Sequence, residues 1–272
     1  MTMSHIIAVV NQKGGVGKTT TTVNLAAALA AQGKRVLVVD LDPQANATSG
    51  VGVNHRELPH GLYQAIVGEK QLHHIVVDTT IPNFRIAPAT ADLSGANIEL
   101  VNVPDREFQL YKLLMEARTA YDYIFIDCPP SLGLLTINGL VAADQVLIPV
   151  QAEYFALEGL GQLLQTVNLV KENLKPQLVV LGAVLTMFDA RNRLSQDVLD
   201  ELYKHFPNTI FKSVIPRTVR LAEAPSFGKT IFQYDPGGRG AAAYERLAQE
   251  VHDTLYPPVP TPAVPGVSDD VL

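Results

Sequence analysis

The sequence predicts an α/β fold built as one doubly wound, mostly parallel sheet flanked by helices on both faces. Three observations predict it. The 272 residues are 47% hydrophobic and 18% charged, which is the composition of a globular chain with a sizeable core. Short apolar runs alternate with helix-like segments along most of the chain. A glycine-rich loop separates the first apolar run from the first helix-like segment.

The first βαβ unit occupies residues 5–40. Residues 5–10 are an apolar run that predicts a buried strand, and residues 19–32 are rich in Ala and Leu and predict a helix. Gly33 follows where a helix commonly ends on a glycine. Residues 34–40 (KRVLVVD) predict the next strand, so a right-handed parallel crossover is expected.

The alternation continues to residue 255. Apolar runs predict strands, and spacings of three and four residues between leucines and valines predict helices. The predicted strands are residues 84–87, 121–127, 145–150 and 177–186. The predicted helices are residues 60–67, 106–118, 157–174, 194–205 and 241–255. We therefore expect one domain over residues 1–256, followed by a mobile Pro-rich tail over 257–272.

Composition narrows the class of protein. Cys128 is the single cysteine, so no disulfide can form within the chain, and a reducing compartment is expected. No run of about 18 apolar residues predicts a membrane span, and MTMSH resembles no signal peptide. These features predict a cytoplasmic protein. A net charge of −6 argues against a surface that is basic throughout.

The loop at residues 13–20, KGGVGKTT, predicts a phosphate-binding site because it lies between a strand and a helix. Gly14, Gly15 and Gly17 let the backbone N–H groups approach phosphate. Lys18 would place its ammonium on the β- and γ-phosphates, and the hydroxyl of Thr19 would bind Mg²⁺. The strict P-loop pattern fails at its first glycine, where the chain has Gln12 and then a second lysine, Lys13.

Carboxylates at two strand ends support this interpretation. Asp127 closes the run YDYIFID and would hold the Mg²⁺ shell through water or through Thr19. Asp40 and Asp42 follow the second strand, at the edge of the sheet where open α/β sheets bind ligands. Asp42 would orient or deprotonate an attacking water and lie beside the metal. Asp40 is either a ligand-facing residue or a loop residue.

Together these motifs resemble a known family. KGGVGKTT, DLDPQ at 40–44 and IDCPPSLG at 126–133 are similar to the deviant Walker A P-loop ATPases. MFDAR at 187–191 and the segment 215–251 resemble the ParA/Soj chromosome- and plasmid-partition proteins within that group. The resemblance covers about residues 5–255.

The resemblance implies an ATP-driven switch with ATP and Mg²⁺ as cofactors. ATP would form a sandwich homodimer, the dimer would bind double-stranded DNA without sequence preference, and a ParB-type centromere-binding protein would stimulate hydrolysis. Lys13 would reach the ATP of the partner subunit, where a cation stabilises the transition state. The expected catalytic residues are Lys13, Lys18 and Asp42. The expected nucleotide-binding residues are Lys13, Gly14, Gly15, Val16, Gly17, Lys18, Thr19, Thr20, Asp127, Pro216 and Thr218, the last two beside the adenine.

A DNA surface is expected in the C-terminal third. Residues 203–240 contain six Lys and Arg residues against two acidic residues, an excess of four positive charges in a chain of net charge −6. Such a surface suits contact with phosphates rather than with bases. The resemblance places DNA-contacting arginines in the segments of Arg191 and Arg220. We therefore expect Arg191, Arg217 and Arg220 to bind DNA. Such a protein would be nucleoid-associated.

Two alternatives remain open. One is a MinD-like cell-division or positioning ATPase, which would need a basic amphipathic helix at its end for membrane contact. The Pro-rich, acidic tail does not provide one, so no membrane partner is expected. The other is a nucleotide-sensing scaffold with a protein target, which would bind ATP without useful turnover.

Overall fold

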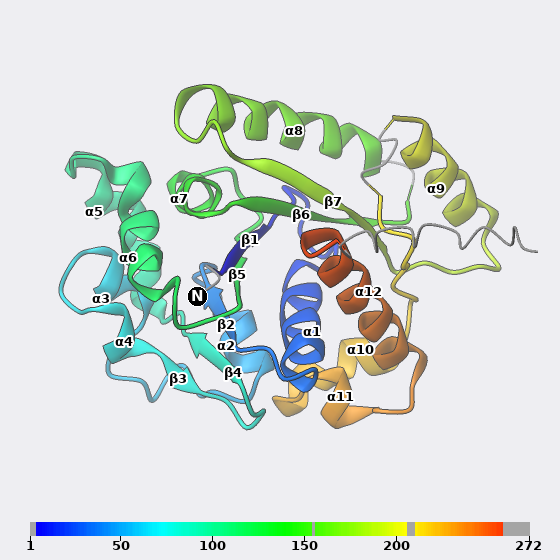
Figure 1. Ribbon diagram of the computed structural model, residues 1–272, viewed down its shortest axis with the longest axis horizontal. Coiled ribbons are helices and arrows are strands. Elements are labelled where there is room, and N and C mark those ends of the chain that lie inside the picture. The colour runs from blue at the N-terminus through cyan, green and yellow to red at the C-terminus, as the bar shows by residue number, and fades with distance from the viewer. Residues whose placement is uncertain (1–3, 154–155, 206–209, 258–272) are drawn as a thin grey trace, which may run out of the picture.

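The structure, a computed structural model, describes residues 4–153, 156–205 and 210–257. Within these residues, seven strands form one sheet in the order β3-β4-β2-β5-β1-β6-β7 (Figure 1). All neighbouring pairs are parallel except β3 and β4. The strands are β1 (His5–Val9), β2 (Val36–Asp40), β3 (Val77–Asp78), β4 (Phe84–Ala87), β5 (Tyr123–Asp127), β6 (Gln145–Gln151) and β7 (Val179–Thr186).

Helices cover both faces of this sheet. On one face α1 packs against α12, and on the other α6 packs against α7, with α8 beside it (Figure 1). The longer helices are α1 (Lys18–Ala31), α6 (Gln109–Ala117), α7 (Leu134–Ala142), α8 (Ala156–Asn173), α9 (Arg193–His205) and α12 (Arg239–Leu255). The shorter ones are α2 (Asn46–Gly50), α3 (Leu62–Ile66), α4 (Leu72–Ile75), α5 (Ala96–Glu99), α10 (Val219–Glu223) and α11 (Ile231–Tyr234).

The central strand β1 shows why both faces must be covered. Ile6 and Ala8 belong to the core under α6 and α7, whereas Ile7 and Val9 belong to the core under α1 and α12. Successive side chains of a strand point to opposite faces, so an apolar run without alternation needs a helix layer on each side. The predicted fold class is thereby confirmed.

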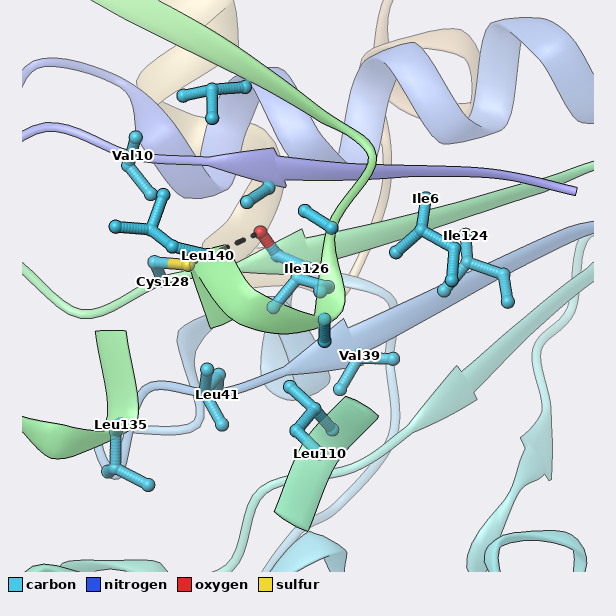
Figure 2. Close-up of a cluster of buried hydrophobic side chains, with 14 of the residues drawn as sticks. Ile6, Val10, Val39, Leu41, Leu110, Ile124, Ile126, Cys128, Leu135 and Leu140 are labelled. Carbon is cyan, nitrogen blue, oxygen red and sulfur yellow. Dashed lines mark hydrogen bonds between the residues drawn. The ribbon is translucent and has the colours of Figure 1, made fainter. Parts of the chain in front are cut away.

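The core under α7 is closely packed. Figure 2 shows Leu135 and Leu140 of α7 with Leu41, Ile126 and Cys128 from the strand ends below them. Cys128 is buried in this cluster, and its thiol points to the carbonyl of Ile126 at 3.8 Å. Burial raises the pKa of this thiol. The side chain is therefore a core residue.

Most predicted elements appear within a few residues of their expected bounds. Gly33 follows α1 with φ of 82°, the left-handed conformation that favours glycine. The sequence did not predict β3, α7 or the short helices α2, α4, α5, α10 and α11. The strand β3 has two residues and the short helices four or five, too few to show a period, and α7 is mostly apolar and buried, without a polar face. Apart from Pro257, the tail at 257–272 lies outside the described residues.

Gly139 offers a test of the packing under α7. A Cβ at this position would lie 2.8 Å from Sγ of Cys128 and 3.1 Å from Cδ2 of Leu41, closer than packed atoms tolerate. We expect Gly139→Ala to lower the free energy of unfolding by about 1–3 kcal/mol, measured by urea denaturation. The matched control is Gly161→Ala on α8, where a Cβ meets nothing within 4 Å. This control should stabilise the helix by up to about 1 kcal/mol. A neutral Gly139→Ala would contradict the packing described.

Candidate functional site

The phosphate loop runs from the end of β1 to the first turn of α1. Gly15 and Gly17 have φ of 76° and 87°, which a residue with a side chain adopts only with strain. Gly17 is the N-cap of α1 and supplies no capping side chain. The N–H groups of the first turn therefore face the loop without a side-chain cap, as an anion site at a helix N-terminus requires.

The end of β7 holds this loop in place. The hydroxyl of Thr186 donates to the carbonyl oxygens of Val16 at 2.7 Å and Val150 at 3.2 Å. Val16 is buried, so it supports the loop from below rather than lining it. The loop is thus tied to β6 and β7, which come from a distant part of the chain.

Lys18 lies inside the site. Its ammonium donates to the carbonyl oxygen of Lys13 at 3.0 Å, and the residue is only 7% exposed. Burial lowers the pKa of Lys18, while the nearby carboxylates of Asp127 and Asp42 oppose that shift. The ammonium is therefore held at the loop among carboxylates.

Asp127 joins β5 to the first turn of α1. Its two carboxylate oxygens accept from the hydroxyls of Thr19 at 2.7 Å and Thr22 at 3.0 Å. Burial raises the pKa of this carboxyl, although both hydrogen bonds favour the ionised form. Thr19 and Asp127, both expected at the Mg²⁺ site, are thus in direct contact. A hydroxyl beside a carboxylate is the oxygen donor set that Mg²⁺ prefers.

The described residues contain no group of three His, Cys, Asp or Glu side chains able to hold a metal ion. Mg²⁺ commonly takes one or two protein ligands and completes its shell with water and phosphate oxygens. Thr19 and Asp127, with Asp42 across the cleft, are the residues available for it.

Asp40, the last residue of β2, and Asp42, two residues later, have different surroundings. Asp40 is fully buried, and one of its oxygens accepts from the backbone N–H of Thr48 at 2.8 Å and from its hydroxyl at 2.6 Å. That hydroxyl also accepts from the N–H of Ala89, at the end of β4. Burial and the neighbouring Asp127 raise the pKa of Asp40. Asp40 therefore ties the ends of β2 and β4 together and does not line the cleft.

Asp42, in contrast, lines the cleft beside Lys18 and Thr19. One of its oxygens accepts from the backbone N–H of Gln44 at 3.0 Å, which holds the loop in a turn. The side chain is therefore fixed by its own loop while its carboxylate faces the phosphate site.

The cleft has a volume of about 610 Å³ and is lined by five segments of the chain, of which Met187 is one. Gly14, Gly15, Gly17, Lys18, Thr19 and Thr20 form one wall of it. The loop and helix after β2 add Asp42, Gln44, Asn46, Ser49 and Gly50. Pro130 follows Asp127, and Pro225, Ser226 and Lys229 come from the C-terminal part. Volume and lining suit a phosphate chain.

A second cavity of about 280 Å³ adjoins this cleft and shares Gly17, Thr20 and Met187 with it. It is lined by Thr186, Ile215, Pro216, Arg217, Thr218, Leu221, Ala222 and Tyr244. Its mainly apolar lining beside the phosphate site suits a nucleobase. Pro216 and Thr218, expected near the adenine, both lie here. Met187 separates the cavities with φ of 52°, a strained conformation for this residue.

Lys13 lies outside the cleft. Its ammonium forms an ion pair with Glu153, just past the end of β6, and 43% of its side chain is exposed. It therefore faces outward from its own phosphate site, unlike Lys18.

The basic residues of the C-terminal third divide between two places. Lys229 lines the phosphate cleft, and Arg217 lines the base cavity, where a guanidinium nitrogen lies 3.9 Å from Sδ of Met187. Arg191 and Arg220 lie on the outer surface, paired with Asp189 at 2.9 Å and Glu223 at 3.2 Å. The excess positive charge counted along the sequence is thus not one continuous patch.

Several lining residues carried no signal in the sequence. Asn46, Ser49, Ser226 and Lys229 belong to short helices and loops without a phosphate motif. Asn24 on α1 holds the segment that contains Ser226 and Lys229 close to the cleft, because its side chain accepts from the N–H of Ile231 at 2.7 Å. Only the folded chain shows that residues 225–231 close the cleft. Of the helices in the described ranges, none combines the length and apolarity that a bilayer crossing needs.

Comparisons with known proteins agree with this geometry. The model of a family described as "AAA domain" matches residues 4–180. The chain is 55% identical to the sporulation initiation inhibitor protein Soj of Bacillus subtilis over 249 residues, 92% of this chain and 98% of that protein. It is 48% identical to the chromosome partitioning protein ParA of Myxococcus xanthus, covering 92% of this chain and 88% of that one.

Solved structures show the same architecture. A cobyrinic acid a,c-diamide synthase from Mycobacterium smegmatis, with bound ADP and magnesium, superposes with a TM-score of 0.84 at 36% identity, covering 94% and 96% of the two chains. The septum site-determining protein MinD of Pyrococcus horikoshii, complexed with Mg-ADP, gives a TM-score of 0.75 at 28% identity, covering 94% and 98%. With its deviant phosphate loop and its identity to Soj and ParA over nine-tenths of its length, the chain belongs to the ParA/Soj family of chromosome-partitioning ATPases.

Proposed function

We propose that the protein is a DNA-partition ATPase in which ATP assembles a sandwich homodimer that binds DNA without sequence preference. Hydrolysis, stimulated by a ParB-type partner, would release the DNA. The observation that carries the proposal is the cleft in which Lys18, Thr19 and Asp42 face one another beside a base-sized cavity. The ATPase domain would span residues 1–256, and the protein would associate with the nucleoid.

ATP and Mg²⁺ are the cofactors. Relatives have been solved with ADP and magnesium, and the cleft has the cation, hydroxyl and carboxylates that this pair requires. Bound Mg²⁺ supplies charge neutralisation at the phosphates. Lys18 and the backbone of residues 14–17 would hold the phosphate chain, with Thr20 beside them. The base would lie between Pro216 and Thr218.

Asp42 would act on the nucleophile. Its carboxylate would accept a hydrogen bond from a water in line with the γ-phosphate and take its proton as the phosphorus–oxygen bond forms. The terminal phosphoanhydride bond then breaks, and ADP and inorganic phosphate leave. The turn that fixes Asp42 through Gln44 supports this role, because the carboxylate needs no rearrangement to face the cleft.

Lys13 would act on the partner subunit. Its ammonium lies outside its own cleft and is paired with Glu153, so it is available at the surface that a second copy would face. A lysine supplied across a dimer would stabilise charge on the transferring phosphate, as an arginine finger does. Hydrolysis would then require dimerisation.

DNA would be bound through Arg191 and Arg220. Both side chains are exposed on the outer surface, and a phosphate would replace the carboxylates of Asp189 and Glu223 as their partner. Arg217 lines the base cavity, so we assign it to the nucleotide rather than to DNA. A MinD-like positioning ATPase is the second candidate, favoured by the likeness to MinD of Pyrococcus horikoshii. It would dimerise with ATP but ignore DNA.

Replacing Lys18 should abolish nucleotide binding. We expect Lys18→Ala to weaken ATP binding at least tenfold and to remove turnover, because the buried ammonium is lost from the phosphate site. Calorimetric titration with ATP and Mg²⁺ measures the first effect, and phosphate release measures the second. Lys171→Ala, on the exposed surface of α8, is the control and should behave like the parent. Normal affinity and turnover in Lys18→Ala would show that this lysine does not bind phosphate.

Replacing Asp42 should separate binding from chemistry. Asp42→Asn keeps an oxygen that can accept from the N–H of Gln44 but cannot take a proton. We expect this variant and Asp42→Ala to bind ATP and dimerise, with turnover reduced by at least 100-fold. Sedimentation with ATP tests dimerisation, and single-turnover phosphate release tests hydrolysis. Turnover at the parental rate would remove Asp42 from the mechanism.

Replacing the surface arginines should affect DNA alone. We expect Arg191→Ala and Arg220→Ala to keep basal ATPase activity but to weaken binding to an arbitrary duplex about tenfold at moderate salt. Fluorescence anisotropy with ATP, with ADP and without nucleotide measures this. Arg35→Ala is the matched control, since Arg35 is also exposed and paired, with Asp122 at 2.8 Å. If ATP gives a dimer that ignores DNA in the parent, the MinD-like alternative is favoured.

A further inference from the structure

An exposed apolar strip lies on α5 and in the turn that follows it. Ile98, Val101 and Val103 are 77%, 50% and 37% exposed, and together we call them the α5 patch. Ile98 and Val101 are three residues apart in successive helical turns, so they share one side. The other strongly exposed large apolar side chains of the described residues stand singly along the chain. Single exposed apolar residues are ordinary, whereas a cluster marks an interaction surface.

The surroundings of the α5 patch are acidic. Residues 86–107 contain Asp92, Glu99, Asp105 and Glu107 and one basic residue, Arg106. Arg106 donates to the carbonyl of Val101 at 2.8 Å and is paired with Glu107 at 2.9 Å, so the acidic residues remain in excess. Glu99 accepts from the hydroxyl of Tyr63 at 2.6 Å, and Asp92 accepts from the amide of Gln64 at 3.2 Å. Both donors are neutral groups, whereas Asp105 is paired with Lys112 at 3.3 Å.

The pKa of Tyr63 reflects the negative charges near the α5 patch. The hydrogen bond to Glu99, together with burial and the charges of Glu99, Glu69 and Asp92, raises the pKa of Tyr63 to about 12. Three carboxylates therefore act on one phenol beside the α5 patch. An apolar strip with an acidic border is complementary to a segment that carries aliphatic and basic side chains.

The α5 patch lies away from the proposed DNA residues. Figure 1 shows α5 at the left end of the molecule and α9 at the right end, with α10 in the lower part, right of the middle. Arg191 lies just before α9, and Arg220 lies on α10. A partner bound to α5 would leave both arginines accessible to DNA, so DNA and partner could be held together.

The loop between β5 and α7 connects α5 to the nucleotide cleft. The side chain oxygen of Asn97 on α5 would lie 4.0 Å from a Cβ on Gly133, so α5 packs against the loop between β5 and α7. That loop follows Asp127, and its Pro130 lines the phosphate cleft. A partner that shifted α5 would therefore act on the loop next to the metal-site carboxylate.

We propose that the α5 patch docks a basic, aliphatic-rich segment of a protein partner. Its aliphatic side chains would cover Ile98, Val101 and Val103, and its Lys or Arg side chains would face Glu99 and Asp92. One part of this proposal rests on the proposed function: that the docked partner is the protein that accelerates hydrolysis. The docking surface would then be linked to the cleft through the loop that carries Pro130.

Two variants of the full chain test the surface itself. Ile98→Ser with Val101→Ser removes the apolar contacts, and Glu99→Lys reverses the charge. The probe is a fluorescent helical peptide with leucines on one face and lysines elsewhere, compared with a peptide that carries glutamates in place of the lysines. We expect the parent to bind the lysine peptide and not the glutamate peptide, and each variant to bind roughly tenfold more weakly.

Two controls keep this result specific. Leu169→Ser removes an aliphatic side chain of 59% exposure on α8 and should bind like the parent. Tyr63→Phe removes the same hydrogen bond to Glu99 as Glu99→Lys does but leaves the carboxylate, so it should also bind like the parent. Equal binding by the parent and both α5 variants, or no binding by the parent, would overturn the proposal.

A second measurement separates this proposal from the proposed function. With a ParB-type partner protein added, the double variant should lose the stimulation of ATP turnover while keeping basal turnover and DNA binding. If the parent is not stimulated, the partner step of the proposed function fails, and the peptide titration still decides the surface. If the parent and the double variant are stimulated equally, the surface is wrong and the function stands. Loss of ATP-dependent dimerisation in the double variant would make this face a subunit contact and also overturn the proposal.

Discussion

The contact between the Asp127 carboxylate and the hydroxyls of Thr19 and Thr22 is the interaction on which the site depends. It joins the end of the central strand β5 to the first turn of α1, which follows the neighbouring strand β1. Because the carboxylate is fully buried, the two hydroxyls compensate part of its desolvation. The same contact fixes the direction of α1 and therefore where the N–H groups of its first turn point. One contact therefore positions both the phosphate loop and the oxygens that we propose for Mg²⁺.

The rest of the cleft is assembled around this fixed point by segments that are far apart in the chain. Thr186 at the end of β7 holds the loop through the carbonyl of Val16, and Asn24 on α1 holds the backbone of Ile231. The hydrogen bond of Thr186 places Met187 and the second cavity next to Gly17. The hydrogen bond of Asn24 places residues 225–229 at the cleft. A nucleotide bound as proposed would contact both the N-terminal βαβ unit and the C-terminal segment. That arrangement suits a protein whose nucleotide state must be sensed at its surface.

The location of a charged side chain in the structure cannot be inferred from its neighbours in the sequence. The buried carboxylates Asp40 and Asp127 are neighbours in the register of β2 and β5, yet Asp40 binds Thr48, whereas Asp127 binds Thr19 beside the phosphate loop. The exposed arginines Arg191 and Arg220 have carboxylate partners near them, whereas Lys18 is buried inside the cleft. The acidic surroundings of α5 lie away from these arginines (Figure 1). A chain of net negative charge can in this way present surfaces of opposite sign to different partners.

The sequence by itself determined the fold class and the phosphate loop, and it predicted that Thr19 and Asp127 share the Mg²⁺ site. These follow from local rules: continuous apolar runs need helices on both faces, and parallel strands end at one edge of the sheet. It left the role of Asp40 open, did not indicate β3 or α7, and counted Arg217 and Lys229 with the outer basic residues. Those points were decided only by the tertiary structure, because the lining of the cleft depends on contacts such as Asn24 with Ile231, which lie 207 residues apart and have no periodic signal. Charge counted along a chain likewise does not show which side chains share a surface.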